Sequence, residues 1–247
     1  ACLVGSEMCI RDSFGEYEGS FVLYDLENDA WSIHDMEHAT LRVAPNSTYK
    51  IYDALFGLEE EIITPENSFI AWNGETYPFE AWNADQTLQS AMNSSVNWYF
   101  QTVDEQLGAS DVYSYIQEIG YGNENMSGDF STYWMESSLE ISPIEQVELL
   151  AKLQNNSFGF APENISTVKD AICLSSSDAG TFYGKTGTGR VNGQYVNGWF
   201  IGYIETADNT YFFATNIGAD SDATGGNATE ITMSISVSYT HLTLPTT

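Results

Sequence analysis

Basic residues are scarce in this sequence. Lysine and arginine together number 7, aspartate and glutamate number 35, and the formal net charge is −28 at pH 7. A surface of this charge repels nucleic-acid phosphates and anionic lipid headgroups, so we expect no nucleic-acid partner. The four lysines, Lys50, Lys152, Lys169 and Lys185, are therefore conspicuous, and two of them lie in motifs.

Long apolar runs and paired cysteines are also lacking. No apolar run approaches the roughly 18 residues of a membrane-spanning helix. Two of the three cysteines fall within residues 1–13, and Cys173 is the third. A single cysteine cannot form an internal disulfide, so cysteine usage leaves the redox compartment open. The histidines, His34, His38 and His241, lack metal-ligand spacing, and we expect no metal site.

The two ends of the sequence differ from the rest. Residues 1–13 show neither a signal-peptide pattern nor a strand pattern, and the closing stretch SVSYTHLTLPTT contains no Asp, Glu, Lys or Arg. Both resemble translated adapter sequence. We therefore expect a non-native leader at 1–13, one folded domain at 14–236 and a non-native tail at 237–247. Genuine but irregular termini are the alternative.

The order of patterns along the chain predicts an α+β fold. An apolar fraction of 43% and an aromatic fraction of 14% exclude a disordered composition. Strand patterns occur at both ends and helical patterns between them, so the terminal strands are expected to share one sheet. We expect strands at 19–26, 31–34, 181–186, 195–206 and 210–217, and helices after residue 50 and at about 84–107, 142–154, 162–174 and 225–235. Ser142 and Glu145 form a capping box with Pro143 at the first helical position.

Ser47 and Lys50 form a Ser-x-x-Lys motif where a loop turns into a helix. At this spacing both side chains lie on one helical face, so the amine can reach the hydroxyl. Serine alone is a poor nucleophile, and lysine accepts its proton only when the amine is neutral or chemically modified, which requires burial. The apolar neighbours Ile51 and Leu55 are compatible with burial. Alternatively, Ser47 only caps a helix, since the motif alone is common.

Two further motifs lie later in the chain. Lys185-Thr186-Gly187-Thr188 places a lysine and two hydroxyls where they can hold a carboxylate, and its glycine permits close backbone approach. A polar turn with a solvated lysine is the alternative. Ser95-x-Asn97 lies in the expected helix over 84–107, where both residue types are unfavourable, which suggests another reason for their presence.

The order of the motifs supports a functional interpretation more strongly than any single motif does. Within a single domain the chain contains, in this order, Ser-x-x-Lys, Ser-x-Asn, Tyr121-Gly122-Asn123 and Lys-Thr-Gly. Taken alone, Tyr121-Gly122-Asn123 fits a turn and Trp134 fits a core position. The chain resembles the penicillin-recognising serine acyltransferase superfamily. More narrowly, it is similar to class D β-lactamases and to the penicillin-binding sensor domain of BlaR/MecR-type signal transducers. The stretches that carry the resemblance, within about 19–236, are APNSTYKIYDALFGLE, YPFEAWN, SVNWYFQ, YGN, YWMESSLEIS and YGKTGTG.

The resemblance implies a fold and a reaction. The fold is β-lactamase/transpeptidase-like, with a central antiparallel sheet flanked by helices and a mostly helical lobe. Ser47 is the nucleophile that β-lactam antibiotics acylate. Lys50 is the base, with no obligatory cofactor, although carbon dioxide can convert its amine into a carbamate that Trp134 supports. Ser95 relays protons.

The resemblance also assigns the remaining site residues. Lys185, Thr186 and Thr188 hold the drug carboxylate, with Gly187 between them. Backbone N–H groups of Ser47 and Thr188 form the oxyanion hole, where the loss of one donor typically costs about 3 kcal/mol. Asn97, Trp134, Tyr121 and Asn123 are supporting residues.

Asn97 separates the two functions that the resemblance offers. Class D hydrolases usually carry a hydrophobic residue at this position, whereas the sensors carry a polar amide. An amide beside the carbamate favours loss of carbon dioxide, after which a protonated Lys50 cannot activate water and the acyl group persists. We therefore expect a sensor, with a class D β-lactamase as the alternative. A peptidoglycan transpeptidase and a non-catalytic binding module are weaker alternatives.

The sensor resemblance also implies a location and partners. It places the chain outside the cytoplasm, as a cell-surface domain of a membrane protein, with a secreted protein as the alternative. The partners implied are β-lactam antibiotics and an upstream membrane-embedded domain that this sequence does not contain.

Overall fold

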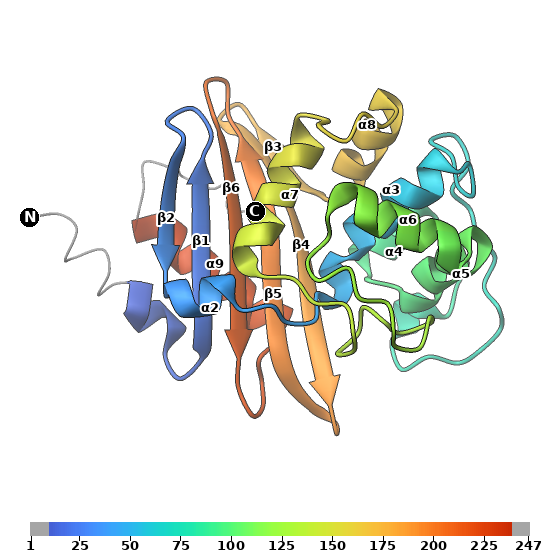
Figure 1. Cartoon of the computed structure of the whole chain (residues 1–247), viewed down its shortest axis with the longest axis horizontal. Helices are drawn as coiled ribbons and strands as arrows, with labels where there is room; N and C mark the ends of the chain where they lie inside the picture. The colour runs from blue at the N-terminus through green and yellow to red at the C-terminus, as the bar shows by residue number, and fades with distance from the viewer. Residues whose placement is uncertain (1–9, 239–247) are drawn as a thin grey trace, which may run out of the picture.

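One antiparallel sheet forms the centre of the molecule (Figure 1). The computed structural model describes residues 10–238, and the strands follow the order β2-β1-β6-β5-β4-β3. They are β1 (Glu18–Asp25), β2 (Ala30–His34), β3 (Cys173–Ser177), β4 (Gly180–Val191), β5 (Gln194–Glu205) and β6 (Thr210–Gly218). Because β1 pairs with β6, strands from the two ends of the sequence share one sheet, as the sequence predicted.

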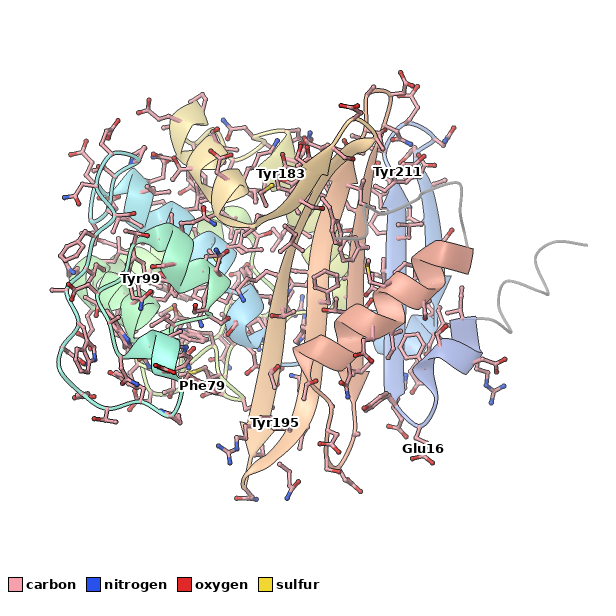
Figure 2. The ribbon with its side chains drawn as sticks, turned by 180° about the vertical axis from the view of Figure 1, so that it is seen from behind. Glu16, Phe79, Tyr99, Tyr183, Tyr195 and Tyr211 are labelled. Carbon is pink, nitrogen blue, oxygen red and sulfur yellow. The ribbon has the colours of Figure 1, made fainter. Side chains whose placement is uncertain are left out.

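The two faces of the sheet support separate apolar cores. Side chains alternate along a strand, so in β5 Trp199 and Ile201 join one core while Phe200 and Ile204 join the other. Helix α9 (Gly225–Ser238) crosses the second face, as Figure 2 shows. Helices α2 (Met36–Thr40) and α7 (Pro143–Gln154) pack on the opposite face.

Residues 10–14 form a short helix on the α9 side of the sheet. Ile10 and Phe14 are buried there, in the same apolar core as Ile231 and Ile235 of α9. The proposed leader over 1–13 therefore overlaps this helix, and most of the proposed tail over 237–247 falls outside the described residues. The domain boundaries given above stay predictions.

A helical lobe lies beyond the β4–β3 edge of the sheet (Figure 1). Helix α3 is buried along nearly its whole length, which its almost continuous apolar sequence IYDALFGL explains. The lobe contains η1 (Asn46–Thr48), α3 (Lys50–Glu59), η2 (Glu80–Trp82), α4 (Leu88–Asn93), α5 (Asn97–Leu107), α6 (Ala109–Ile119) and α8 (Pro162–Ala171). Within residues 10–238, no helix combines the length and apolarity needed to cross a bilayer.

The expectation of one long helix over 84–107 is wrong. Helix α4 ends at Asn93 and α5 begins at Asn97, and between them Ser95 has a φ of 53°. A left-handed residue interrupts the helical hydrogen-bond ladder. The apolar periodicity continued through the break because both helices turn their apolar sides to the same core. Residues 173–174, which were expected to be helical, begin β3 instead, and α6 was not predicted.

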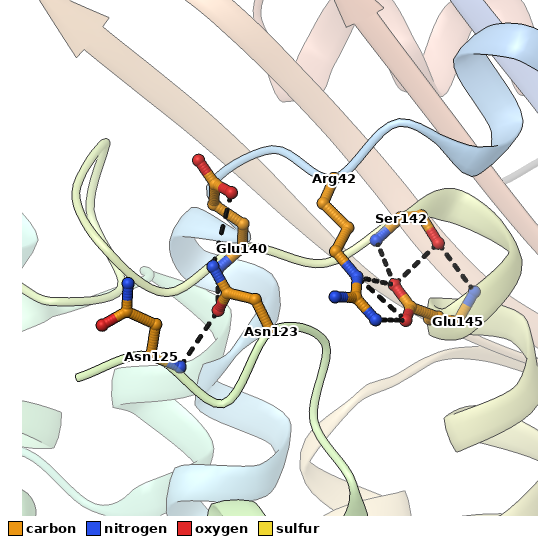
Figure 3. A network of polar contacts seen from close by, with 6 residues as sticks. All are labelled: Arg42, Asn123, Asn125, Glu140, Ser142 and Glu145. Carbon is orange, nitrogen blue, oxygen red and sulfur yellow. Dashed lines mark hydrogen bonds and ion pairs between the residues drawn. The ribbon is translucent and has the colours of Figure 1, made fainter.

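The capping box at the start of α7 is confirmed. Oγ of Ser142 accepts a hydrogen bond from the Glu145 N–H at 3.3 Å, and Oε2 of Glu145 accepts one from the Ser142 N–H at 2.9 Å. The same Glu145 carboxylate pairs with Arg42 (Figure 3). This pair fastens the segment before Ser47 to the N-terminus of α7.

Candidate active site

A cavity of about 590 Å³ separates the helical lobe from β4 and β5. Figure 2 labels two residues of its rim, Phe79 from the lobe and Tyr195 from the β4–β5 hairpin. Polar groups from three of the predicted motifs face this space. The lining residues are Asn46, Ser47, Phe79, Ala81, Trp82, Ser94, Ser95, Asn97, Trp134, Met135, Glu136, Thr186, Thr188, Arg190 and Tyr195.

Ser47 and Lys50 meet as their spacing predicted. Nζ of Lys50 lies 3.0 Å from Oγ of Ser47, at the junction of η1 and α3. The N-cap positions of these two helices are Pro45 and Tyr49, and neither caps its helix with a side chain. Ser47 is therefore not a helix cap, and its hydroxyl faces the cavity instead.

The Lys50 nitrogen is enclosed by oxygen atoms and aromatic rings. It donates hydrogen bonds to the Ser95 carbonyl oxygen at 2.7 Å and to Oδ1 of Asn97 at 2.6 Å. It also lies 5.3 Å from the ring centroids of Phe100 and Trp134. The side chain is fully buried.

Burial decides the protonation state of Lys50. Removal from water lowers the pKa of its amine well below the usual value, the nearby Lys185 charge lowers it further, and Asp53 acts in the opposite direction. A neutral amine has two N–H bonds and one lone pair. The N–H bonds satisfy the Ser95 carbonyl and Asn97, so the lone pair faces the Ser47 hydroxyl. The arrangement can accept the proton of Ser47.

Ser95 contacts both lysines of the site. Its carbonyl oxygen accepts from Lys50, and its Oγ lies 2.6 Å from Nζ of Lys185. The backbone of Ser95 is left-handed at this point, between α4 and α5. Lys185 also donates to the Thr186 carbonyl oxygen at 3.0 Å, and burial lowers the pKa of its amine to about 7.

The segment after Lys185 runs along η1 at close range. A side chain at Gly187 would place its Cβ 2.9 Å from the Pro45 carbonyl oxygen, so glycine is required for this approach. Thr186 and Thr188 line the cavity on either side of it. Oγ1 of Thr188 accepts a hydrogen bond from the Gly225 N–H at 2.9 Å, which leaves its hydroxyl proton available to a ligand.

The predicted supporting residues fall into two groups. Asn97 and Trp134 line the cavity, and Nδ2 of Asn97 lies 3.1 Å from Sδ of Met135. Tyr121 is fully buried, with its ring edge-on to that of Tyr49, and lies behind the site. Asn123 is not among the lining residues.

Asn123 instead holds two loop segments together (Figure 3). Its Nδ2 donates to the Ser138 carbonyl oxygen at 2.9 Å, and its Oδ1 accepts from the N–H groups of Asn125 and Glu140 at 3.1 and 3.0 Å. The loop that it fixes leads from Trp134 to α7. Asn123 can therefore affect the site only through the position of that loop.

Several lining residues lay outside the predicted motifs. Oε1 of Glu136 accepts from Nδ2 of Asn46 and from Nδ2 of Asn197, each at 2.8 Å, and so joins the lobe to the sheet. Arg190 lies 5.7 Å from the Tyr195 ring centroid. Phe79, Trp82 and Glu136 lie in the stretches YPFEAWN and YWMESSLEIS, which carried the family resemblance. No motif assigned these three residues a role.

One hydrogen-bond donor at the site fits a carbamate formed from Lys50 and carbon dioxide. Within the described part of the chain, the buried indole N–H of Trp134 has no hydrogen-bond partner, and this ring lies beside Nζ of Lys50. An unpaired buried donor fits an added anionic group. The acceptors, namely the Ser95 carbonyl and Oδ1 of Asn97, fit the amine or ammonium form instead.

Comparison with known proteins gives one family and a consistent set of relatives. Residues 19–236 match the family model described as penicillin binding protein transpeptidase domain. The regulatory protein BlaR1 of Bacillus licheniformis is 48% identical to this chain over 217 residues, which make up 88% of the chain and 36% of that relative. The chain thus spans little more than one third of the length of BlaR1.

Two of the solved structures with the same fold represent different kinds of protein. The C-terminal domain of the Bacillus licheniformis BlaR penicillin-receptor matches with a TM-score of 0.87 and 45% identity, covering 93% of this chain and 92% of that one. The class D β-lactamase BAT-2 matches with a TM-score of 0.89 and 36% identity, covering 96% and 97%. The predicted α+β fold, with its antiparallel sheet and helical lobe, is confirmed.

Proposed function

Because the chain belongs to the penicillin-binding protein transpeptidase domain family, we propose that it is the β-lactam-binding domain of an antibiotic sensor. The drug acylates Ser47, and the acyl group is released slowly, so the long-lived adduct signals that the drug is present. The observation that carries this proposal is the 2.6 Å contact between Nζ of Lys50 and Oδ1 of Asn97, directly beside the Ser47 hydroxyl.

The first step of acylation uses two groups that already lie in contact. Oγ of Ser47 bonds to the lactam carbonyl carbon while its proton passes to the Lys50 nitrogen, 3.0 Å away. The lactam C–N bond then breaks, and the proton reaches the leaving nitrogen through the Ser95 hydroxyl. Backbone N–H groups of Ser47 and Thr188 stabilise the negative charge on the carbonyl oxygen.

Binding of the drug depends on its carboxylate. The hydroxyls of Thr186 and Thr188, which line the cavity, and the ammonium of the buried Lys185 on the same strand β4 hold that group. The overall charge of −28 repels anions, so a local cation is needed at this point. Arg42 cannot serve because Glu145 engages it, whereas Arg190 lies at the cavity.

Release of the acyl group needs a base that activates water beside the ester. Carbon dioxide, when bound at Lys50 as a carbamate, supplies a strong proton acceptor there, and the Trp134 indole N–H is the donor that would hold it. Asn97 opposes this because its oxygen accepts from an N–H of Lys50. Without the carbamate the site lacks this strong acceptor, so water beside the ester is activated slowly and the ester persists.

A class D β-lactamase is the second candidate function. The observation that favours it is the contact set of Ser47, Lys50 and Ser95, which serves acylation equally well in a hydrolase. The likeness to the class D β-lactamase BAT-2 supports the same candidate. The two functions differ only in the fate of the ester.

The proposed sensor is part of a larger protein. Its location would be outside the cytoplasm, attached to a membrane-embedded part that precedes it, and the 36% coverage of BlaR1 supports this view. A secreted protein is the alternative.

A chromogenic β-lactam tests the proposal. A sensor gives one burst of product, stoichiometric with protein, and then almost no further turnover. Sustained turnover would identify a class D β-lactamase instead. Ser47→Ala is the control, since it removes the acylated oxygen and should abolish the burst.

A further inference from the structure

Glu136 lies beside the neighbours of both residues that form the proposed oxyanion hole. Asn46 directly precedes Ser47, and Gly189 directly follows Thr188. Oε1 of Glu136 accepts a hydrogen bond from Nδ2 of Asn46 at 2.8 Å and occupies the space that a side chain at Gly189 would take. Glu136 belongs to none of the motifs, yet it lines the same cavity as Ser47 and Thr188.

The loop segment 134–136 holds Asn46 at two points. The Asn46 N–H donates to the Trp134 carbonyl oxygen at 2.9 Å, and the Asn46 side chain donates to Glu136. Asn46 is buried and has a φ of 50°, a left-handed backbone that asparagine tolerates better than most residues. These two contacts fix the direction in which the chain enters Ser47.

Strand β5 is attached to the same carboxylate. Oε1 of Glu136 also accepts from Nδ2 of Asn197 at 2.8 Å, and Asn197 pairs with Gly189 in the sheet. The second N–H of each asparagine amide goes to the Ala44 carbonyl oxygen, at 3.2 Å from Asn46 and 2.9 Å from Asn197. Both asparagines are buried and use both N–H groups, so this network is expected to be rigid.

Glycine at position 189 makes room for the network. A Cβ added to Gly189 would overlap Oε1 of Glu136 and would lie 2.9 Å from Nδ2 of Asn46. The absence of a side chain therefore lets the carboxylate approach the backbone of β4 immediately after Thr188. Glu136 thus lies between the backbone segment that carries Ser47 and the one that carries Thr188.

We propose that Glu136 is a positioning residue that sets the separation between the N–H groups of Ser47 and Thr188. These two residues belong to η1 and β4, so no local structure fixes their spacing. Stabilisation of an oxyanion requires donors that are already placed at about 2.7–3.1 Å from the charged oxygen. A carboxylate that accepts hydrogen bonds from both sides can hold such a spacing, although Glu136 itself takes no part in the covalent steps.

This inference deepens the proposed function and rests on it for the acylation of Ser47. Stopped-flow measurement of the burst with a chromogenic β-lactam tests it. The dependence of the burst rate on drug concentration gives the affinity of the non-covalent complex and the first-order rate of acylation separately. The burst amplitude counts the folded, reactive protein. A purely structural role would lower the amplitude, whereas a positioning role lowers the first-order rate.

Three substitutions of Glu136 separate position from charge. Glu136→Ala removes the acceptor, and Glu136→Asp keeps the charge but is one methylene too short to reach both asparagine amides. We expect both to lower the first-order acylation rate roughly 10- to 100-fold with little change in drug affinity, as for a displaced oxyanion donor. Glu136→Gln keeps an acceptor oxygen in place and should retain most of the rate.

Glu140→Ala is the matched control. The Glu140 carboxylate lies in the same loop but contacts Asn123 instead, so its loss should leave the first-order acylation rate unchanged. An unchanged rate in Glu136→Ala and Glu136→Asp would overturn the inference. An equal loss of rate in Glu136→Gln or in Glu140→Ala would overturn it as well.

Where Glu136→Ala does not fold, the comparison of Glu136→Asp with Glu136→Gln decides. Slower acylation in Glu136→Asp supports the inference, and equal or faster acylation contradicts it. Sustained turnover by the wild type would defeat the proposed sensor function, but single-turnover rates with protein in excess would still decide the inference. Absence of acylation in the wild type would contradict both.

Discussion

Nζ of Lys50 lies 2.6 Å from Oδ1 of Asn97 and 3.0 Å from Oγ of Ser47. One nitrogen therefore faces both the group that reacts with the drug and the amide that restrains it. An amine in this position can take the proton of Ser47 during acylation. The same amide oxygen accepts from an N–H of Lys50 and so disfavours a carbamate on this nitrogen. The proposed persistence of the acyl group rests on this contact.

The amide of Asn97 is the first test of this relationship. Asn97→Val removes the acceptor from Lys50, so the nitrogen loses the contact that favours its protonated form. A hydrogen bond to a charged group is worth about 1.5–3 kcal/mol, which corresponds to roughly 10- to 100-fold in an equilibrium. We predict that deacylation accelerates by a similar factor, measured from steady-state turnover of a chromogenic β-lactam.

Asn93→Val is the control for this variant. Asn93 is an exposed residue at the end of α4, so the same substitution there leaves Lys50 untouched. Equal turnover in Asn97→Val, Asn93→Val and wild type would show that the amide does not restrain the site.

Lys185 should give acylation an alkaline limit near neutrality. Its burial lowers the pKa to about 7, so the free protein loses the ammonium as the pH rises above that value. A neutral amine cannot pair with the drug carboxylate. We predict that the second-order rate of acylation falls several-fold between pH 7 and 9. The rate is measured from the burst at limiting drug concentration.

Lys185→Arg separates charge from shape in this experiment. A guanidinium stays charged across the whole range, so the alkaline limb should disappear even where the maximal rate is lower. An alkaline limb of the same position and steepness in Lys185→Arg would assign it to another group.

The buried carboxyl groups of Asp53 and Asp104 should make the fold less stable at high pH. Burial raises the pKa of Asp104 from the ordinary aspartate value of about 3.9 to about 7. Between these two pH values the folded chain therefore binds more protons than the unfolded chain. Stability therefore falls as the pH rises through this window, by up to about 1.4 kcal/mol per pH unit. We predict that Asp53→Asn with Asp104→Asn removes this slope, as measured by urea unfolding at several pH values.

Glu205→Gln should behave in the opposite way. Burial raises the pKa of Glu205, but hydrogen bonds from Gln154 and Lys169 lower it by more, so the net shift is downward. A lowered carboxyl pKa stabilises the folded chain above the unfolded value, so its removal costs stability at neutral pH and not in acid. Identical pH profiles for the double variant and for Glu205→Gln would contradict the assignment of this slope to Asp53 and Asp104.

The sequence predicted the local parts of the site well. The spacing of Ser47 and Lys50 fixed their contact, because residues three apart share one helical face whatever the rest of the chain does. Lys185 lay in a strand that could be recognised from its β-prone surroundings. The sequence identified Ser95 as a site residue but did not predict its left-handed backbone, because a single break in a helix does not disturb the apolar periodicity.

The tertiary parts of the site could not be predicted in the same way. In the sequence, Asp53 is an isolated acidic residue in an otherwise apolar helical stretch, and Asp104 is an isolated acidic residue in another helix. The burial of both depends on the packing of α3 against α5, which no local pattern specifies. The same holds for Glu136, whose partners Asn46 and Asn197 come from distant parts of the chain. Asn123 lay in a recognisable motif but contacts a loop outside the cavity.

The lifetime of the ester on Ser47 tests the central claim most directly. The protein is acylated with a β-lactam, free drug is removed, and the intact mass is followed with time. We predict that the mass increment of one acyl group persists long after removal of the drug, and that Asn97→Val shortens its lifetime. Return of the wild type to its unmodified mass within seconds would contradict the claim and identify a hydrolase.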